Sequence, residues 1–279
     1  MSATAVPRRS FRLRLRGARR HLLTVYALLA LAYLLVPIGV VLAFSFNDPA
    51  GKFNYTWDGF TFDNWTGWDA VPGLRDAIVL SVEIAVVASV VATTLGTLIA
   101  LALVRHRFRG RGATNMLIFL PMSTPEIVLG ASLLSLFLTA SGVFTLGFWT
   151  IAIAHTMFCV SYIVVTVKAR LIGFDRHLEE AAMDLGANAL VTFVKVTLPL
   201  LAPAILSGFL LSFALSIDDF VITNFVTGDR ITFPVFVWGA ARVGAPPQVN
   251  VIGSVIFLLA VGGMVVNALV QMRRSKGAT

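Results

Sequence analysis

The chain has 279 residues, of which 57% are hydrophobic and 13% are charged. Ordinary soluble domains carry about 25% charged residues, so this composition excludes a soluble globular domain and favours a protein embedded in a bilayer. The single cysteine, Cys159, excludes a disulfide framework within the chain.

Six apolar stretches are each long enough for the roughly 20 residues that a membrane helix requires. In chain order they cover residues 22–46, 77–104, 114–140, 148–169, 199–227 and 249–272. The sequence therefore predicts an all-α, polytopic membrane protein with six transmembrane helices in a domain spanning residues 22–272. Arginines precede the first stretch, but its apolar run is too long for a signal peptide, so we expect an uncleaved anchor.

The basic residues predict the orientation of these helices. Eighteen of the 22 lysines and arginines fall in segments that share one side of the membrane with the N-terminus. Loops rich in lysine and arginine stay in the cytoplasm. We therefore expect both termini to be cytoplasmic, with a basic tail at 1–21 and a short tail at 273–279, in a chain that crosses a cell membrane several times. The net charge of +8 then marks orientation rather than a nucleic-acid surface.

Polar residues inside the predicted spans are candidates for function. Glu83 lies near the outer end of the second stretch, and Glu126 lies in the third, within "FLPMSTPEIVLGAS". Pro121 and Pro125 each remove a helix hydrogen bond, which favours a broken helix that lines a binding site or gate. The alternative is a simple kink satisfied by a nearby hydroxyl. His155, in the fourth stretch, is expected to hydrogen-bond a neighbouring helix rather than a ligand.

The polar segment 171–198 is an unusually long inner loop for a helical bundle. Asp175 is a suitable cap for a first short helix, and Gly186 is a natural stop for it. Asn188 can cap a second helix, which we expect to end where Pro199 begins the next span. The acidic residues of the loop are Glu179, Glu180 and Asp184. Anionic lipid headgroups would repel these charges, which favours a protein partner over a helix lying on lipid.

The segment "EAAMDLGANALVTFVKVTLP" resembles the EAA loop of ABC-transporter permeases, E-A-A-x3-G-x9-I-x-L-P, with valine in the isoleucine position. In that family the loop inserts into a separate ATPase subunit. The resemblance implies an ATPase-coupling site at Glu179, Glu180, Ala181, Ala182, Asp184 and Gly186. The sequence lacks the G-x-x-x-x-G-K-[ST] loop that cradles ATP phosphates. We therefore expect no enzyme activity and no cofactor in this chain, with ATP and Mg bound by the partner.

Two adjacent carboxylates, Asp218 and Asp219, lie in the fifth stretch, within "LSIDDFVITNFVTG". With no lysine or arginine predicted at comparable depth, they favour a cation site open to water. Adjacent residues on a helix point about 100° apart, so the pair is expected to divide its roles. One carboxylate would line a translocation path, and the other would bond a neighbouring helix through Ser216, Thr223 or a partner permease. The sequence leaves open which is which.

The chain is also similar to the PotC-type permeases of spermidine/putrescine importers, in "PEIVLGASLL", "LSIDDFVITNFVTG" and "ITFPVFVWGAARVGAPPQVN". This resemblance implies a type I ABC importer permease (MetI-like) fold that forms half of a translocation path for polyamines. Its partners would be a homologous second permease, two ATPase subunits and an extracytoplasmic polyamine-binding protein. The predicted path residues are Glu126, Asp218, Asp219, Glu83 and Trp238. Gln248 departs from the family, which usually has an acid there.

Two other functions remain open at this point. Related ABC permeases with an EAA loop import iron, thiamine or organic cations. An ion-coupled secondary carrier would use the intramembrane acids as coupling groups, but it leaves the EAA loop unexplained.

Overall fold

The computed structural model describes residues 9–276, with side chains over residues 22–263. Over the backbone range every regular element is a helix, apart from an isolated bridge between Asn47 and Phe60. The all-α prediction is therefore confirmed. Residues 1–8 and 277–279 of the two predicted tails lie outside the described residues, and helix α1 (Arg9–Phe44) already includes the second part of the N-terminal tail.

The described residues contain several helices suited to crossing a membrane. Four are long and apolar enough, namely Leu22–Phe44 within α1, α3 (Leu74–Arg105), α6 (Phe148–Ile172) and the run Ala189–Asp218. A bent pair of helices adds a fifth. The sixth predicted stretch falls in α12 (Pro247–Lys276), whose side chains beyond residue 263 lie outside the described residues. The chain is therefore a multi-pass membrane protein, and the count of six stays a prediction.

The chain forms two compact units, one of residues 1–71 and 242–279 and the other of residues 72–241. In the first unit, α12 contacts both α1 and the short helix α2 (Asp63–Thr66). The loop that follows α1 is organised by Asn47, whose side-chain amide donates to Asn54 Oδ1 (2.6 Å) and to the Thr56 carbonyl (2.7 Å). These bonds fix the part of the loop that lies between α1 and α2.

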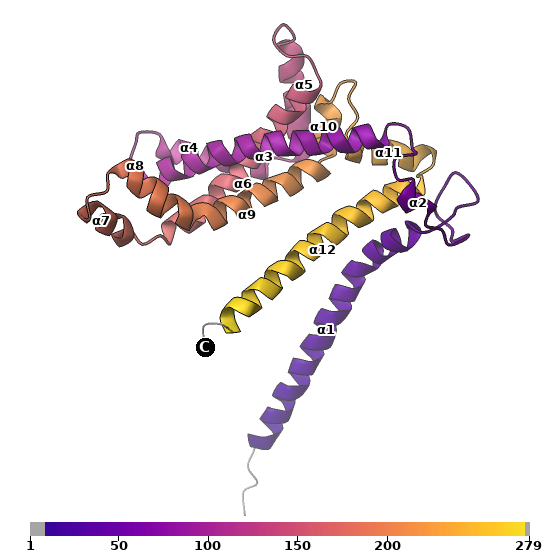
Figure 1. Ribbon diagram of the computed structural model, residues 1–279, viewed down its shortest axis with the longest axis horizontal. Helices are drawn as coiled ribbons and strands as arrows, with labels where there is room; N and C mark the ends of the chain where they lie inside the picture. The colour runs from indigo at the N-terminus through magenta and orange to yellow at the C-terminus, as the bar shows by residue number, and fades with distance from the viewer. Residues whose placement is uncertain (1–8, 277–279) are drawn as a thin grey trace, which may run out of the picture. The chain divides into compact units, whose positions relative to one another are not determined.

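The second unit is built on three helices, α3, α6 and α9 (Leu198–Asp218), which lie side by side (Figure 1). Small residues bring these helices close together. A Cβ on Gly96 of α3 would lie 2.6 Å from Ile163 Cβ of α6, and one on Gly208 of α9 would lie 3.0 Å from Ile163 Cδ1. Close approach through small residues is the usual way in which membrane helices gain packing contacts.

The third predicted stretch is two helices rather than one. Helices α4 (Arg111–Ser123) and α5 (Glu126–Thr139) meet at an angle of 107°. Thr124 precedes Pro125 and is extended (φ −81°, ψ 132°), because a residue before proline is kept out of the helical region. The Thr124 and Ser123 hydroxyls donate to the Leu120 carbonyl at 2.7 and 3.1 Å. The hydroxyls thus cap a full break, not the simple kink considered from the sequence.

The fifth predicted stretch is also interrupted. Helix α9 ends at Asp218, and Asp219 is extended (φ −65°, ψ 118°) before α10 (Val221–Val226) begins. The far end of α10 is tied to α6, because the Thr150 hydroxyl donates to the Val226 carbonyl at 2.8 Å. Helix α11 (Phe233–Val243) follows. The two breaks place Glu126 and the aspartate pair at helix ends.

The polar segment 171–198 contains α7 (His177–Asp184), α8 (Ala189–Thr192) and the π-helix η1 (Phe193–Thr197). Asn188 caps α8 as predicted, with its Oδ1 accepting from the Val191 N–H at 2.9 Å, and Gly186 adopts φ +90° at the turn. The predicted end of this second helix at Pro199 is wrong. Helix α8 continues through η1 into α9, where proline is tolerated because the π segment has already changed the hydrogen-bond pattern.

Candidate functional site

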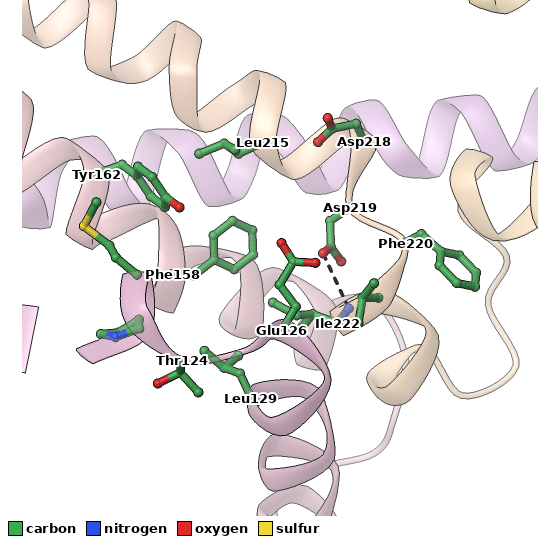
Figure 2. A pocket seen from close by; sticks show the side chains of 13 residues that line it. Thr124, Glu126, Leu129, Phe158, Tyr162, Leu215, Asp218, Asp219, Phe220 and Ile222 are labelled. Carbon is green, nitrogen blue, oxygen red and sulfur yellow. Dashed lines mark hydrogen bonds between the residues drawn. The ribbon is translucent and has the colours of Figure 1, made fainter. Parts of the chain in front are cut away.

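A cavity of about 370 Å³ lies in the second unit at the two helix breaks (Figure 2). Three of its lining residues are acidic, Glu126, Asp218 and Asp219, and three are aromatic, Phe158, Tyr162 and Phe220. Among the described residues, those that line it include no lysine, arginine or histidine. The structure therefore brings together the three deeper acids that the sequence analysis singled out.

Glu126 reaches the cavity because it is the first residue of α5 after the break. A carboxylate in the first helical turn is favoured by the exposed N–H groups and the dipole of the helix. The side chain is solvent-exposed and has no hydrogen-bond partner among the described residues. Its charge is thus available to a ligand in the cavity.

Asp219 also lines the cavity, with its carboxylate already bound by the protein. Its Oδ2 accepts hydrogen bonds from the backbone N–H and the hydroxyl of Thr223, both at 2.8 Å, and its Oδ1 accepts from the Ile222 N–H at 3.4 Å. Its side chain is only 7% exposed. Asp219 therefore holds the first turn of α10 in place as well as lining the cavity (Figure 2).

His155 connects this aspartate to α6. Its Nε2 lies 2.9 Å from Thr223 Oγ1 and 3.3 Å from Asp219 Oδ2, and its Nδ1 lies 2.7 Å from Ser216 Oγ. The Thr223 hydroxyl gives its proton to the carboxylate, so its oxygen can accept a hydrogen bond from Nε2 of the ring. The sequence-based expectation of a helix–helix hydrogen bond for His155 matches this network.

Asp218 differs from its neighbour. It is exposed, whereas Asp219 is largely buried, and the two carboxylates point in different directions in Figure 2. From the sequence, one aspartate was expected to bond Ser216, Thr223 or a partner permease. Asp219 is bonded to Thr223, which is one of these partners. The geometry thus assigns the bonded position to Asp219 and the open one to Asp218.

The cavity has the chemistry of a cation site. Its carboxylates supply negative charge, and the aromatic faces of Phe158, Tyr162 and Phe220 can attract ammonium groups. Phe158 and Tyr162 were not singled out from the sequence. Together with His155 they are spaced three and four residues apart on α6, and this single-face spacing was the available signal.

The two other predicted path residues lie outside the cavity lining. Glu83 is exposed on α3 and does not line the cavity. Trp238 of α11 packs against Phe220, with ring centroids 5.0 Å apart. Trp238 therefore contacts the cavity wall through Phe220, and Glu83 stays a predicted path residue outside this cavity.

Comparison with known proteins identifies the family. The profile of the binding-protein-dependent transport system inner membrane component family matches residues 92–275. The chain belongs to this family.

Among the relatives of this permease is the spermidine/putrescine transport system permease protein PotC of Haemophilus influenzae. The two are 36% identical over 259 residues, which cover 92% of this chain and 99% of the relative. The putrescine transport system permease protein PotI of Escherichia coli (strain K12) is 40% identical over 243 residues, covering 83% and 84% of the two chains. The permease therefore matches polyamine-system subunits along nearly their whole length.

A solved structure supports the fold assignment. A chain of a bacterial ABC transporter that imports the acidic polysaccharide alginate superposes with a TM-score of 0.63 at 21% identity. It covers 96% of this permease and 99% of that chain. The permease thus has the ABC importer permease (MetI-like) fold that the PotC-type resemblance implied.

The predicted coupling residues of the permease do not share one surface. Glu180, Ala181, Asp184 and Gly186 are exposed, and Ala182 is half-buried. Glu179, in contrast, is 8% exposed. It therefore does not belong to the outward face of α7, although the sequence analysis grouped it with the others.

Glu179 is held by residues that the sequence analysis did not connect with it. Arg105 donates from Nη1 to Oε2 at 2.7 Å and from Nη2 to Oε1 at 2.6 Å, and the Thr197 hydroxyl donates to Oε1. Burial alone would raise the pKa of Glu179. The hydrogen bonds from Arg105 and Thr197, with the charge of Arg105, outweigh it and hold the pKa of this carboxyl below its usual value.

Proposed function

We propose that this permease is a membrane subunit of a bacterial ATP-driven importer for polyamines such as spermidine and putrescine. The observation that carries the proposal is the cavity with Glu126, Asp218 and Asp219 on its walls and no basic residue among those that line it. A polyamine is a flexible chain of spaced ammonium groups, and each group needs a carboxylate or an aromatic face. The polyamine systems named for its relatives support the same substrate class.

The subunit would act within a larger assembly. A second, homologous permease would complete the path, an extracytoplasmic binding protein would deliver the polyamine, and two ATPase subunits would bind ATP and Mg. The exposed face of α7, with Glu180 and Asp184, is available for an ATPase. In this arrangement the chain has no enzymatic activity of its own, and both of its termini face the cytoplasm.

The proposal is tested by reconstituting the permease with its partner permease, ATPase and binding protein in liposomes. Spermidine carried by the binding protein should stimulate ATP hydrolysis and accumulate inside. The Asp218→Asn variant should lower uptake roughly tenfold, as expected when about 1.4 kcal/mol of interaction with an ammonium group is lost.

A matched control is Glu83→Gln, which neutralises an exposed acid that does not line the cavity. Uptake by this variant should fall less than that of Asp218→Asn, because Glu83 lies outside the cavity lining. A wild-type complex that responds only to a different solute would overturn the polyamine assignment, and uptake without any ATPase would overturn the ABC assignment.

A further inference from the structure

The buried carboxylate of α7 faces the interior of the permease rather than its surface. Glu179 and Glu180 are neighbours on the same helix, but Glu179 is 8% exposed, whereas the Glu180 side chain is 62% exposed. An ATPase that contacts the exposed face of α7 can reach Glu180 and cannot reach Glu179. The two acids therefore have different partners.

The contacts of Glu179 come from the inner ends of two long helices. Arg105 is the last residue of α3, and Thr197 is the last residue of η1, directly before α9. The guanidinium of Arg105 also lies over the ring of Phe174, 5.7 Å from its centroid, in the segment that leads from α6 into α7. We call this group of Arg105, Glu179 and Thr197 the α7 anchor.

The geometry of the α7 anchor makes it stiff. Nη1 and Nη2 of Arg105 each donate to a different carboxylate oxygen of Glu179, and such bidentate pairs fix orientation as well as distance. The ion pair is partly buried, with Arg105 and Glu179 side chains 27% and 10% exposed, so water and salt screen it less than a surface pair. A displacement of α7 must therefore move α3 and α9 or break these bonds.

Helix α9 links the anchor to the cavity. It runs for 21 residues from Leu198, next to Thr197, to Asp218 in the cavity lining. A helix of this length spans roughly 30 Å. Movement applied at α7 can thus reach the substrate-facing carboxylate through one continuous element.

We propose that Glu179 is a positioning residue for ATPase coupling, which fixes α7 to α3 and α9 so that movement of α7 is transmitted to the cavity. The role rests on the proposed ATPase partnership but not on the identity of the substrate. Glu180 then contacts the ATPase on the exposed face of α7. Glu179 connects α7 to α3 and α9, so that a movement of α7 also moves these helices.

The test compares Glu179→Gln with Glu180→Arg in the full reconstituted complex. Two readouts are needed, the amount of ATPase that co-purifies with the permease and the ATP hydrolysis that the loaded binding protein stimulates above the basal rate. Glu179→Gln should keep the ATPase bound but lower the stimulated rate at least roughly tenfold, as for the loss of one charge-assisted hydrogen bond. Glu180→Arg should lose the ATPase itself.

Exchanging the two charges distinguishes a loss of coupling between α7 and the cavity from a general disruption of the permease structure. The double variant Arg105→Glu with Glu179→Arg restores an ion pair of reversed polarity and should recover most of the stimulated rate that Glu179→Arg alone loses. If Glu179→Gln releases the ATPase as Glu180→Arg does, Glu179 is a docking residue and the proposal is wrong. Unchanged stimulation in Glu179→Gln, or no recovery in the exchange, also overturns it.

The behaviour of the wild-type complex shows separately whether the proposed function holds. A wild-type complex that responds to another solute leaves the test intact with that solute and refutes only the polyamine assignment. A wild-type chain that binds no ATPase refutes the proposed function instead.

Discussion

The contact between α5 and α10 allows a sharp test of how the cavity is built. Gly130 of α5 is buried against α10, and a Cβ placed on it would lie 2.6 Å from Phe225 Cδ2 and 3.4 Å from Ile222 Cα. Gly130→Ala must therefore push the Phe225 ring away by at least 0.8 Å, the difference between 2.6 Å and the 3.4 Å of an ordinary contact. Because Phe225 and Ile222 both belong to α10, the added methyl group pushes α10 away from α5.

The size of the effect follows from two opposing contributions. Overpacking a well-packed contact costs about 1–3 kcal/mol, whereas replacing glycine by alanine within a helix gains up to about 1 kcal/mol. Gly112→Ala isolates the second contribution, because Gly112 lies in α4 with open space around its added Cβ. The two variants should thus differ in unfolding free energy by about 1–3 kcal/mol.

Thermal unfolding can be followed through the reaction of Cys159, the single and buried cysteine of this chain, in a complex whose partners lack cysteine. Gly130→Ala should unfold at a lower temperature than Gly112→Ala. It should also raise the substrate concentration for half-maximal uptake, because moving α10 carries Asp219 away from Glu126. Equal unfolding temperatures and equal uptake in the two variants would refute the described packing of α5 on α10.

Three further outcomes are expected. Asp219→Asn should lower both uptake and thermal stability, whereas Asp218→Asn should lower uptake alone, since only Asp219 holds Thr223. Thr150→Val should destabilise the permease by about 1–3 kcal/mol, because it leaves the buried Val226 carbonyl without its hydroxyl donor. The Glu179 ion pair should stabilise the folded chain fully above pH 4.5, the ordinary pKa of the carboxyl, and lose its effect as pH falls below 4.5 through the lowered folded pKa.

Each outcome has a measurement that can contradict it. Equal stability losses for the two aspartate variants would remove the distinction between them. Thr150→Ser, which keeps the hydroxyl, should retain most of the stability that Thr150→Val loses, and failure to do so would point to packing instead. For Glu179, unfolding curves of the wild type and Glu179→Gln should differ less as the pH is lowered; a constant difference would show that the charge is not responsible.

The sequence predicted the parts of the cavity that depend on local chemistry. Pro125 marks the break that exposes Glu126, because proline restricts its own residue and the one before it. Asp218 and Asp219 stood out because carboxylates are costly in an apolar helix. Thr223, the residue that bonds Asp219, was among the partners expected from the sequence, because it lies only four residues along the chain. The further contact of Asp219 with His155, 64 residues earlier, has no local pattern that reports it.

The coupling loop was predicted less completely for the same physical reason. Asn188 was recognised as a helix cap because its hydrogen bond is made three residues along the chain. The orientation of Glu179 depends on Arg105, 74 residues away, so an acidic run was interpreted as one exposed face. The continuity of α8 with α9 was missed because Pro199 normally signals a helix start, and the intervening π segment has no sequence signature.

The acidic lining of the cavity also determines which ions gather in it when no substrate is bound. Carboxylates gathered in one confined space repel one another, and without a basic neighbour in the lining their charge is balanced by mobile cations from solution. On the proposed function, a polyamine that arrives there would exchange with these counterions rather than fill a vacant site. Release of cations to bulk solution favours binding entropically, so the apparent affinity is expected to fall as the surrounding salt concentration rises.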